Sequence, residues 1–161
     1  MKFHLVLPAL LLFAAAMFAA EPMRLRAVAV IDGDTFVGSK DARVVRLWGV
    51  DAPELDQPWG EASKVALIAL TNRRQLNIEP KGDSWGRLVA IARRGKEIDI
   101  GLELIKMGLA WHDPRYAPKA KEYAEAEAEA RKAKRGLWSD DKPVSPWDWR
   151  KQQYDGTEED D

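Results

Sequence analysis

The sequence contains no cysteine and only two histidines. Without cysteine, the chain forms no disulfide, offers no thiol nucleophile and cannot hold zinc through thiolates. His4 lies in the apolar N-terminal stretch, which leaves His112 as the single histidine of the remaining chain. One histidine excludes multi-histidine metal centres and paired-histidine acid–base catalysis. Hydrolytic chemistry would therefore depend on carboxylates and arginines.

A charge excess of one sign is also missing, because 25 Lys and Arg residues nearly balance 26 Asp and Glu residues, for a net charge of −1. No global positive field thus indicates a nucleic-acid partner, and an anionic ligand would need a local cluster of basic side chains. The acidic C-terminal residues 154–161, YDGTEEDD, predict a solvated, disordered tail.

Residues 1–20 combine an early lysine, an apolar run interrupted only by Pro8, and several alanines. This order is typical of a bacterial secretory signal peptide, and the run is somewhat short for a membrane-spanning helix of about 20 apolar residues. The small residues Ala14 and Ala16 favour cleavage after Ala16, within a window that extends to Ala20. An uncleaved membrane anchor is the alternative. The sequence therefore predicts a periplasmic or secreted protein without stable membrane association after cleavage.

The hydrophobic pattern predicts five strands, with a helix between the third and the fourth, and two further helices. The strands are expected at 24–30, 35–37, 43–50, 75–80 and 87–94, and the helices at 60–74, 100–107 and 119–135. This order of elements matches the OB-fold, a five-stranded Greek-key barrel. We therefore expect a mainly β, α+β domain with three helices over 21–140, followed by a Trp- and Pro-rich extension and the acidic tail over 141–161.

Four acidic residues lie where predicted strands end. Asp32 and Asp34 belong to the first turn, and Asp51 and Glu54 follow the third strand. If these two ends meet in a small barrel, their oxygens would suit Ca²⁺ better than Zn²⁺. An ordinary turn and an ordinary strand exit are the alternative, and local spacing alone does not decide between them.

Two arginines accompany these carboxylates: Arg46 on the third strand and Arg87 at the start of the fifth. Guanidinium groups hold phosphate through paired hydrogen bonds and stabilise the charge that develops in phosphoryl transfer. Each arginine taken alone is more often a surface residue. Beside an acidic cation site, the pair indicates a phosphodiesterase.

Five motifs in order carry a resemblance to a known family: VIDGDTF, VRLWGVDAPE, DSWGRLVA, LIKMGLAW and EARKAKRGLW. Over residues 24–138 the chain resembles the staphylococcal-nuclease (thermonuclease) family. The resemblance implies an OB-fold barrel with three helices, Ca²⁺ dependence, and endonucleolytic cleavage of DNA and RNA that leaves 3′-phosphates.

The resemblance also implies roles for residues near the expected cation. Asp34, Asp51 and the backbone carbonyl of Ala52 would bind Ca²⁺; family members often have threonine at the position of Ala52, and a backbone ligand tolerates this change. Asp32 would lie close to the cation without binding it, and Thr35 would support the region through hydrogen bonds.

Catalytic and substrate-binding roles follow from the same resemblance. Arg46 and Arg87 would bind the phosphate, and Glu54 would act as the general base, although it could instead position the attacking water. Trp85 and Tyr116 would contact nucleotide, with packing within its turn as the alternative for Trp85. Members of the wider family that have lost catalysis generally lack some of the Arg and acidic positions, and the presence of all of them here favours an enzyme over a catalytically silent OB-fold module that binds nucleic acid or protein. A phosphodiesterase for small phosphate esters is a third alternative, against which the open groove expected of an OB-fold argues only weakly.

The remaining expectations concern packing and docking of residues outside the predicted site. Trp111 flanks the expected substrate loop, His112 is expected to pack rather than catalyse, and Trp138 is expected in the core. The PWDWR segment, 146–150, is expected to dock back onto the barrel, with base stacking as the alternative. A monomer is the default oligomeric state.

Overall fold

The computed structural model describes residues 23–157, so the predicted signal peptide, its cleavage site and residues 158–161 lie outside the described residues. The strands are β1 (Met23–Val30), β2 (Thr35–Gly38), β3 (Val44–Leu47), β4 (Val50–Asp51), β5 (Gln75–Ser84), β6 (Arg87–Arg94), β7 (Ile98–Asp99) and β8 (Trp111–His112). The helices are α1 (Gly60–Thr71), α2 (Ile100–Lys106), α3 (Lys121–Lys132) and α4 (Pro146–Thr157), with a 3-10 turn at Gly136–Ser139.

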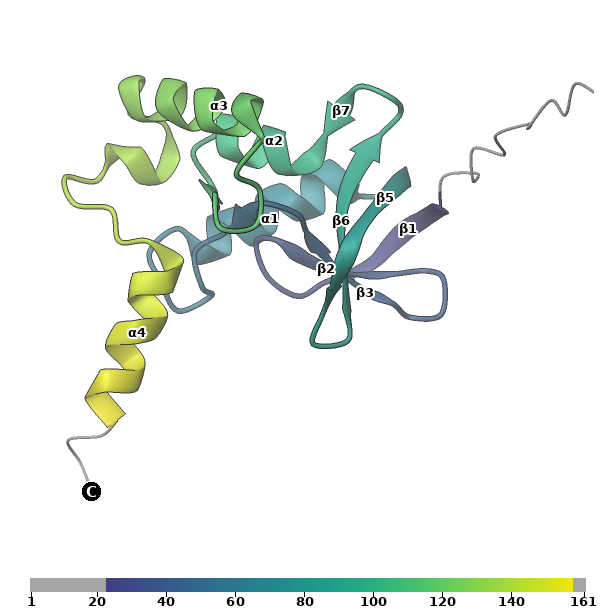
Figure 1. Cartoon of the computed structure of the whole chain (residues 1–161), viewed down its shortest axis with the longest axis horizontal. Helices are drawn as coiled ribbons and strands as arrows, with labels where there is room; N and C mark the ends of the chain where they lie inside the picture. The colour runs from purple at the N-terminus through teal and green to yellow at the C-terminus, as the bar shows by residue number, and fades with distance from the viewer. Residues whose placement is uncertain (1–22, 158–161) are drawn as a thin grey trace, which may run out of the picture.

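Five strands form a closed mixed barrel (Figure 1). Antiparallel pairs join β1 to β2 and β5, β2 to β3, and β5 to β6, and a parallel pair between β3 and β6 closes the barrel. This architecture confirms the predicted OB-fold class. The three predicted helices correspond to α1, α2 and α3, and α4 is an additional helix.

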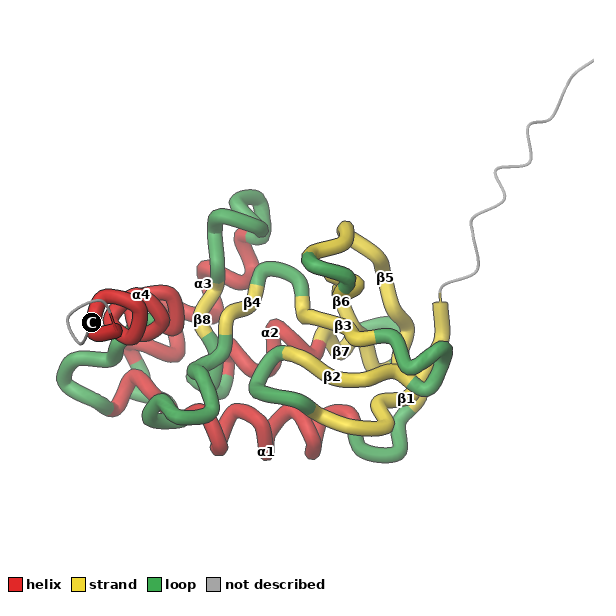
Figure 2. Tube along the Cα trace, turned by 90° about the horizontal axis from the view of Figure 1, so that it is seen from below, coloured by secondary structure: helices red, strands yellow, loops and turns green. Residues whose placement is uncertain are grey.

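The core lies inside the barrel and beneath the helices that cover it. Strand side chains alternate between the two faces of a sheet, so Val45 and Leu47 point inward while Arg46 between them points outward. In Figure 2, α1 runs along one side of the barrel. The largest fully buried apolar side chains are Phe36, Leu67, Leu76, Ile78, Ile100, Leu104, Ile105 and Val45.

A second, smaller apolar cluster lies away from the barrel around Trp111 and Trp138, whose ring centroids are 4.3 Å apart. The guanidinium of Arg131 lies 4.8 Å from the ring centroid of Trp111 and 3.8 Å from that of Trp138. The predicted burial of Trp138 is confirmed. Trp111 is also buried, at 8% exposure, so it packs here rather than facing the substrate loop.

Several element boundaries differ from the sequence-based expectation. The predicted third strand is divided at 48–49 into β3 and β4. The fourth predicted strand continues beyond Pro80 to Ser84, because a register shift between Pro80 and Gly82 accommodates the proline, which cannot donate a ladder hydrogen bond. The third helix begins at Lys121.

The C-terminal region contains the largest correction, since residues 146–157 form the helix α4. Ser145 Oγ accepts from Asp148 N (3.2 Å), as an N-cap side chain does, and also donates to Asp148 Oδ2 (2.5 Å). Pro146 occupies the first helical position, where its missing N–H costs nothing. Tyr154–Thr157 therefore continue a helix and do not form the predicted disordered tail.

Within residues 23–157, none of the helices combines the length and the apolar character that crossing a membrane requires. Helix α4 lies at the end of the molecule opposite the barrel strands (Figures 1 and 2). Its docking contacts include the loop that precedes α1, where Trp149 Nε1 and Gln153 Nε2 donate to the two carboxylate oxygens of Asp56, at 3.3 and 2.6 Å. Trp147 also packs against Trp111, with ring centroids 5.5 Å apart.

Tyr123 connects α3 to α2 through a buried hydrogen bond. Its hydroxyl donates to Asp99 Oδ2 (2.9 Å), while Asp99 Oδ1 accepts from Leu102 N and caps α2 as expected. Burial, together with the nearby Asp99 carboxylate, raises the pKa of Tyr123 and keeps the hydroxyl protonated.

Replacing Tyr123 by Phe is expected to lower the free energy of unfolding by about 1–3 kcal/mol, because a buried carboxylate oxygen loses its hydroxyl donor. Urea unfolding followed by tryptophan fluorescence measures the change. The matched control Tyr116→Phe, at a residue that is 67% exposed, is expected to change stability by no more than about 0.5 kcal/mol. Equal effects of the two substitutions would contradict a special contribution of the buried bond.

Candidate active site

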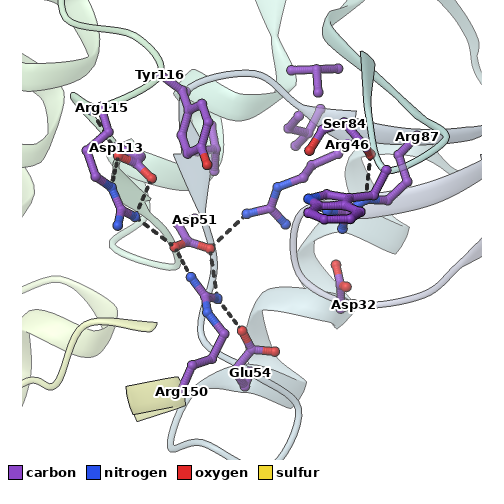
Figure 3. A pocket seen from close by; sticks show the side chains of 15 residues that line it. Asp32, Arg46, Asp51, Glu54, Ser84, Arg87, Asp113, Arg115, Tyr116 and Arg150 are labelled. Atoms are coloured by element: carbon purple, nitrogen blue, oxygen red, sulfur yellow. Dashed lines mark hydrogen bonds and ion pairs between the residues drawn. The ribbon is translucent and has the colours of Figure 1, made fainter. Parts of the chain in front are cut away.

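A polar pocket of about 420 Å³ opens where the ends of β2, β3 and β6 meet the loop after β4. Figure 3 shows charged side chains from distant parts of the chain pointing into it. The charged and aromatic lining residues are Asp32, Arg46, Asp51, Glu54, Trp85, Arg87, Asp113, Arg115, Tyr116 and Arg150.

Arg46 bridges two buried carboxylates at the base of this pocket. Its Nη1 donates to Asp34 Oδ1 (2.5 Å) and its Nη2 donates to Asp51 Oδ1 (2.8 Å). Asp34 is 2% exposed and Asp51 is 1% exposed. The second oxygen of Asp34 accepts from Ala52 N (2.9 Å), so the first turn and the exit of β4 are tied together.

Two further residues of the first turn orient Asp34. Thr35 Oγ1 donates to Asp34 Oδ1 (2.8 Å), and Asp32 Oδ1 accepts from Asp34 N (3.0 Å). Thr35 is buried, whereas Asp32 also lines the pocket. The structure thus places both residues beside Asp34, where the sequence comparison had suggested supporting roles.

The barrel register places both arginines on the same outer face. The parallel pairing of β3 with β6 aligns Arg46 with Val89. Arg87 lies two residues before Val89, and residues two apart on a strand share a face. Arg87 Nε donates to Ser84 O (3.4 Å), and no carboxylate among residues 23–157 forms an ion pair with its guanidinium.

Two glycines allow the loops that carry the acids to approach each other. A Cβ on Gly33 would lie 2.6 Å from the Cβ of Ala52, and a Cβ on Gly60 would lie 1.8 Å from the carbonyl oxygen of Glu54. Gln57 also holds this loop, since its Oε1 accepts from Glu54 N (3.1 Å). Close backbone contact therefore positions Glu54 at the rim of the pocket.

The surroundings of Asp34 disfavour the ionised form of its carboxyl group. Burial raises the pKa of Asp34 from 3.8 to about 7, and the neighbouring Asp32 and Asp51 act in the same direction. Arg46 and the N–H of Ala52 act in the opposite direction without offsetting the burial. For Arg46, burial is outweighed by Asp34 and Asp51, which raise the pKa of the guanidinium.

The donors present fit a hard divalent cation. Asp34 and Asp51 supply carboxylate oxygens, the ligand type that Ca²⁺ prefers. Burial, and to a smaller extent Asp32 and Asp51, raises the pKa of Asp34, and a bound cation would favour its ionised form. No group of three or more acidic or histidine side chains within 23–157 already converges as a ligand set. The oxygens of Asp34 and Asp51 instead accept from arginine and backbone donors.

Two exposed aromatic rings lie at the pocket. Trp85 is 95% exposed at the tip of the β5–β6 hairpin, which rules out packing within its turn. Tyr116 is 67% exposed and lines the same pocket. Both rings are therefore free to stack on planar groups. His112, in contrast, forms a hydrogen bond through Nε2 with Ala117 O (3.0 Å) and packs as expected.

Three lining residues were not assigned site roles from the sequence: Asp113, Arg115 and Arg150. Arg115 Nε and Nη2 donate to Asp113 at 2.8 and 2.6 Å, and Nη2 lies 3.8 Å from Asp51 Oδ2. Burial opposes ionisation of Asp113, but the hydrogen bonds from Arg115 outweigh it and hold the pKa of Asp113 below its ordinary value.

Arg150 reaches the site from α4. Its Nη2 donates to Asp51 Oδ2 (2.8 Å), and its Nη1 donates to Asp51 Oδ1 (3.3 Å) and to Glu54 Oε1. Burial opposes its charge, but the hydrogen bonds to Asp51 and Glu54 raise the pKa of Arg150 above its ordinary value. The N-cap residue Ser145, followed by Pro146, could have revealed the helix that carries Arg150, but no local signal indicates where that helix docks.

The comparisons with known proteins agree with this fold. The family described as staphylococcal nuclease homologue matches residues 44–140. A probable staphylococcal-like nuclease of Oryza sativa subsp. japonica is 40% identical over 110 residues, which cover 68% of this chain and 29% of the rice protein.

Two bacterial proteins are matched over more of their length. An uncharacterized endonuclease of Haemophilus influenzae is 37% identical over 139 residues, 80% of this chain and 73% of that protein. Protein ParB of Escherichia coli is 32% identical over 142 residues, 81% of this chain and 80% of that protein. The fold is a nuclease-type OB barrel with an arginine–carboxylate pocket, and the chain belongs to the staphylococcal-nuclease family.

The raised pKa of Asp34 predicts a specific pH dependence of stability. Between pH 4 and pH 7 the folded state binds a proton at Asp34 that the unfolded state has lost, so this contribution to stability disappears as the pH rises through 7. Asp34→Asn removes the contribution. With EGTA present, the ratio of the folding equilibrium constant of Asp34→Asn to that of the wild type is therefore expected to rise by about tenfold or more between pH 5 and pH 8.

Urea unfolding at the two pH values measures this relative gain. The control Asp41→Asn replaces an exposed carboxylate and is expected to follow the wild-type pH dependence. Parallel pH profiles for Asp34→Asn and the wild type would show that Asp34 titrates normally in the folded protein.

Proposed function

We propose that the protein is a nuclease that hydrolyses phosphodiester bonds within DNA and RNA with little sequence preference. The main observation in support is that Arg46, Arg87 and Glu54 line one pocket together with buried Asp51, in a chain of the staphylococcal-nuclease family. The names of the rice and Haemophilus relatives, a nuclease and an endonuclease, support the same reaction.

The aromatic rings at the pocket account for binding without sequence preference. Trp85 and Tyr116 expose their faces to solvent and would stack on nucleobases, an interaction worth about 1–3 kcal/mol per base and tolerant of base identity. Arginine side chains between the rings would contact the phosphodiester backbone. Because the net charge of the chain is only −1 and acidic residues accompany the arginines in the pocket, the attraction for a polyanion would come from these arginines together with a bound cation.

The catalytic roles follow from position and chemistry. Glu54 would accept a proton from a water molecule whose oxygen attacks phosphorus, while the bond from phosphorus to the 5′-oxygen breaks. The products would be a 3′-phosphate and a 5′-hydroxyl, whose oxygen takes up a proton. Arg46 and Arg87 would donate hydrogen bonds to the non-bridging oxygens as negative charge accumulates on them.

Asp34, Asp51 and the carbonyl of Ala52 would hold Ca²⁺, which belongs to the proposal as the cofactor. When bound, such a cation polarises a phosphoryl oxygen and lowers the pKa of bound water. Its binding requires an ionised Asp34, so cation uptake near neutral pH would release protons from the site.

The nuclease proposal predicts loss of cleavage when the site is altered. Protein produced from the full chain is incubated with plasmid and single-stranded DNA, with Ca²⁺ or with EGTA. Cleavage is expected only with Ca²⁺, with kcat reduced about 10²–10⁴-fold in Glu54→Gln and about 10²–10³-fold in Arg87→Ala. The control Arg94→Ala changes the arginine at the opposite end of β6 and is expected to retain activity.

Cleavage that persists in EGTA, or that is undiminished in both site variants, would contradict the proposed chemistry. Binding of DNA without cleavage under any cation would instead support the catalytically silent binding module. End-group analysis of the products distinguishes a 3′-phosphate from a 5′-phosphate.

Residues 1–20 support the further proposal that the protein works in the periplasm or outside the cell. Expression of the full chain in a Gram-negative host is expected to yield a protein that lacks 16 to 20 N-terminal residues. N-terminal sequencing and the intact mass test this directly. Recovery of the protein with its original N-terminus in the membrane fraction would favour an uncleaved anchor.

A further inference from the structure

Helix α4 brings a charged side chain into the pocket from outside the region that matches the family, which ends at residue 140. The helix is held by Asp56, which accepts from Trp149 and Gln153. The segment before α4 is held by Gln57, whose Nε2 donates to Val144 O (2.7 Å). These contacts direct Arg150 toward the pocket (Figure 3).

The Arg150 guanidinium engages both oxygens of Asp51 and one oxygen of Glu54. Asp51 is a proposed cation ligand and Glu54 is the proposed proton acceptor, so Arg150 contacts both kinds of functional carboxylate at once. With Arg46 on Asp51 Oδ1, neither oxygen of this carboxylate is left without a guanidinium donor.

Charge makes this arrangement exclusive. A guanidinium and a divalent cation on the same carboxylate oxygen would lie within a few ångströms of each other, where like charges in a partly buried site repel strongly. Arg46 would remain on Asp51 Oδ1, but departure of Arg150 removes the only guanidinium donor within 3 Å of Asp51 Oδ2 among residues 23–157, and a cation at this oxygen would replace it. Arg150 and a divalent cation are therefore mutually exclusive partners of the Asp51 carboxylate.

We propose that Arg150 competes with a divalent cation for Asp51, so that docked α4 lowers the affinity of the site for the cation and cation binding releases α4. The inference rests on the proposed cation site. Because binding free energies are reciprocal, the factor by which docking weakens cation binding is also the factor by which the cation weakens docking. Glu54 becomes free to contact water in the same event.

The alternative role for Arg150 is a third phosphate-binding guanidinium, and it predicts the opposite results. A phosphate-binding Arg150 would leave cation affinity unchanged or increase it through a better-organised site. Competition requires that removing the Arg150 charge strengthens cation binding. The sign of the change in affinity therefore separates the two roles without any measurement of nuclease activity.

The test is isothermal titration calorimetry of Ca²⁺ into protein produced from the full chain, without nucleic acid. Arg150→Met keeps the length of the apolar stem and removes the guanidinium. It is expected to bind Ca²⁺ at least about fivefold more tightly than the wild type, the lower end of typical coupling between sites. Lys151→Met removes the same charge from the next, exposed position of α4 and is expected to remain within about twofold of the wild type.

Hydrogen exchange of the α4 amides provides the second readout. Ca²⁺ is expected to accelerate exchange in α4 of the wild type, while α4 of Arg150→Met exchanges rapidly with or without the cation. Exchange that is insensitive to Ca²⁺ in the wild type would mean that Arg150 acts through its charge alone, and would overturn release of the helix.

The outcomes also separate this inference from the proposed function. Equal or weaker Ca²⁺ binding by Arg150→Met overturns the competition but leaves the cation site intact. A similar gain in affinity for Lys151→Met overturns the specific contact in favour of general charge repulsion. Absence of Ca²⁺ binding to every variant, including the wild type, overturns both the cation site and the competition built on it.

Discussion

The bridge that Arg46 makes between Asp34 and Asp51 is the interaction on which the rest of the pocket depends. It joins the turn after β1 to the end of β4, two places that the chain reaches 17 residues apart, and it places a positive charge between two buried acids. Removing one member of such a buried group leaves the others uncompensated, which typically costs about 3–5 kcal/mol. The same side chain therefore supports the fold and is also one of the two proposed phosphate-binding groups.

The pocket combines residues inside the range that matches the family with residues outside it. Arg87 and Glu54 lie within the matched residues 44–140, whereas Asp34 precedes them and Arg150 follows them. Three guanidinium groups approach the single buried carboxylate of Asp51, at 2.8 Å for Arg46 and Arg150 and 3.8 Å for Arg115. Asp51 is thus the residue at which β3, the loop after β8 and α4 contact one another through their arginines.

Much of the barrel could be predicted from the sequence because its signals are local. Alternation around Val45 and the turn at Gly33 indicate strands and reversals without knowledge of the fold. Arg150 could not be placed in this way, because its position depends on docking of α4 at Asp56, a contact across more than ninety residues. The helix itself has a local signal, because Ser145 is a favourable N-cap residue and Pro146 suits the first helical position.

The parallel pairing of β3 with β6 has a consequence for how the molecule forms. It joins Val45 to Leu88 across an intervening stretch of more than forty residues, so it closes the barrel at a large entropic cost of loop closure. Arg46 and Arg87 acquire their common face only through this pairing. A chain whose barrel has not closed therefore carries both arginines of the proposed phosphate site without assembling them, and the proposed site forms together with barrel closure.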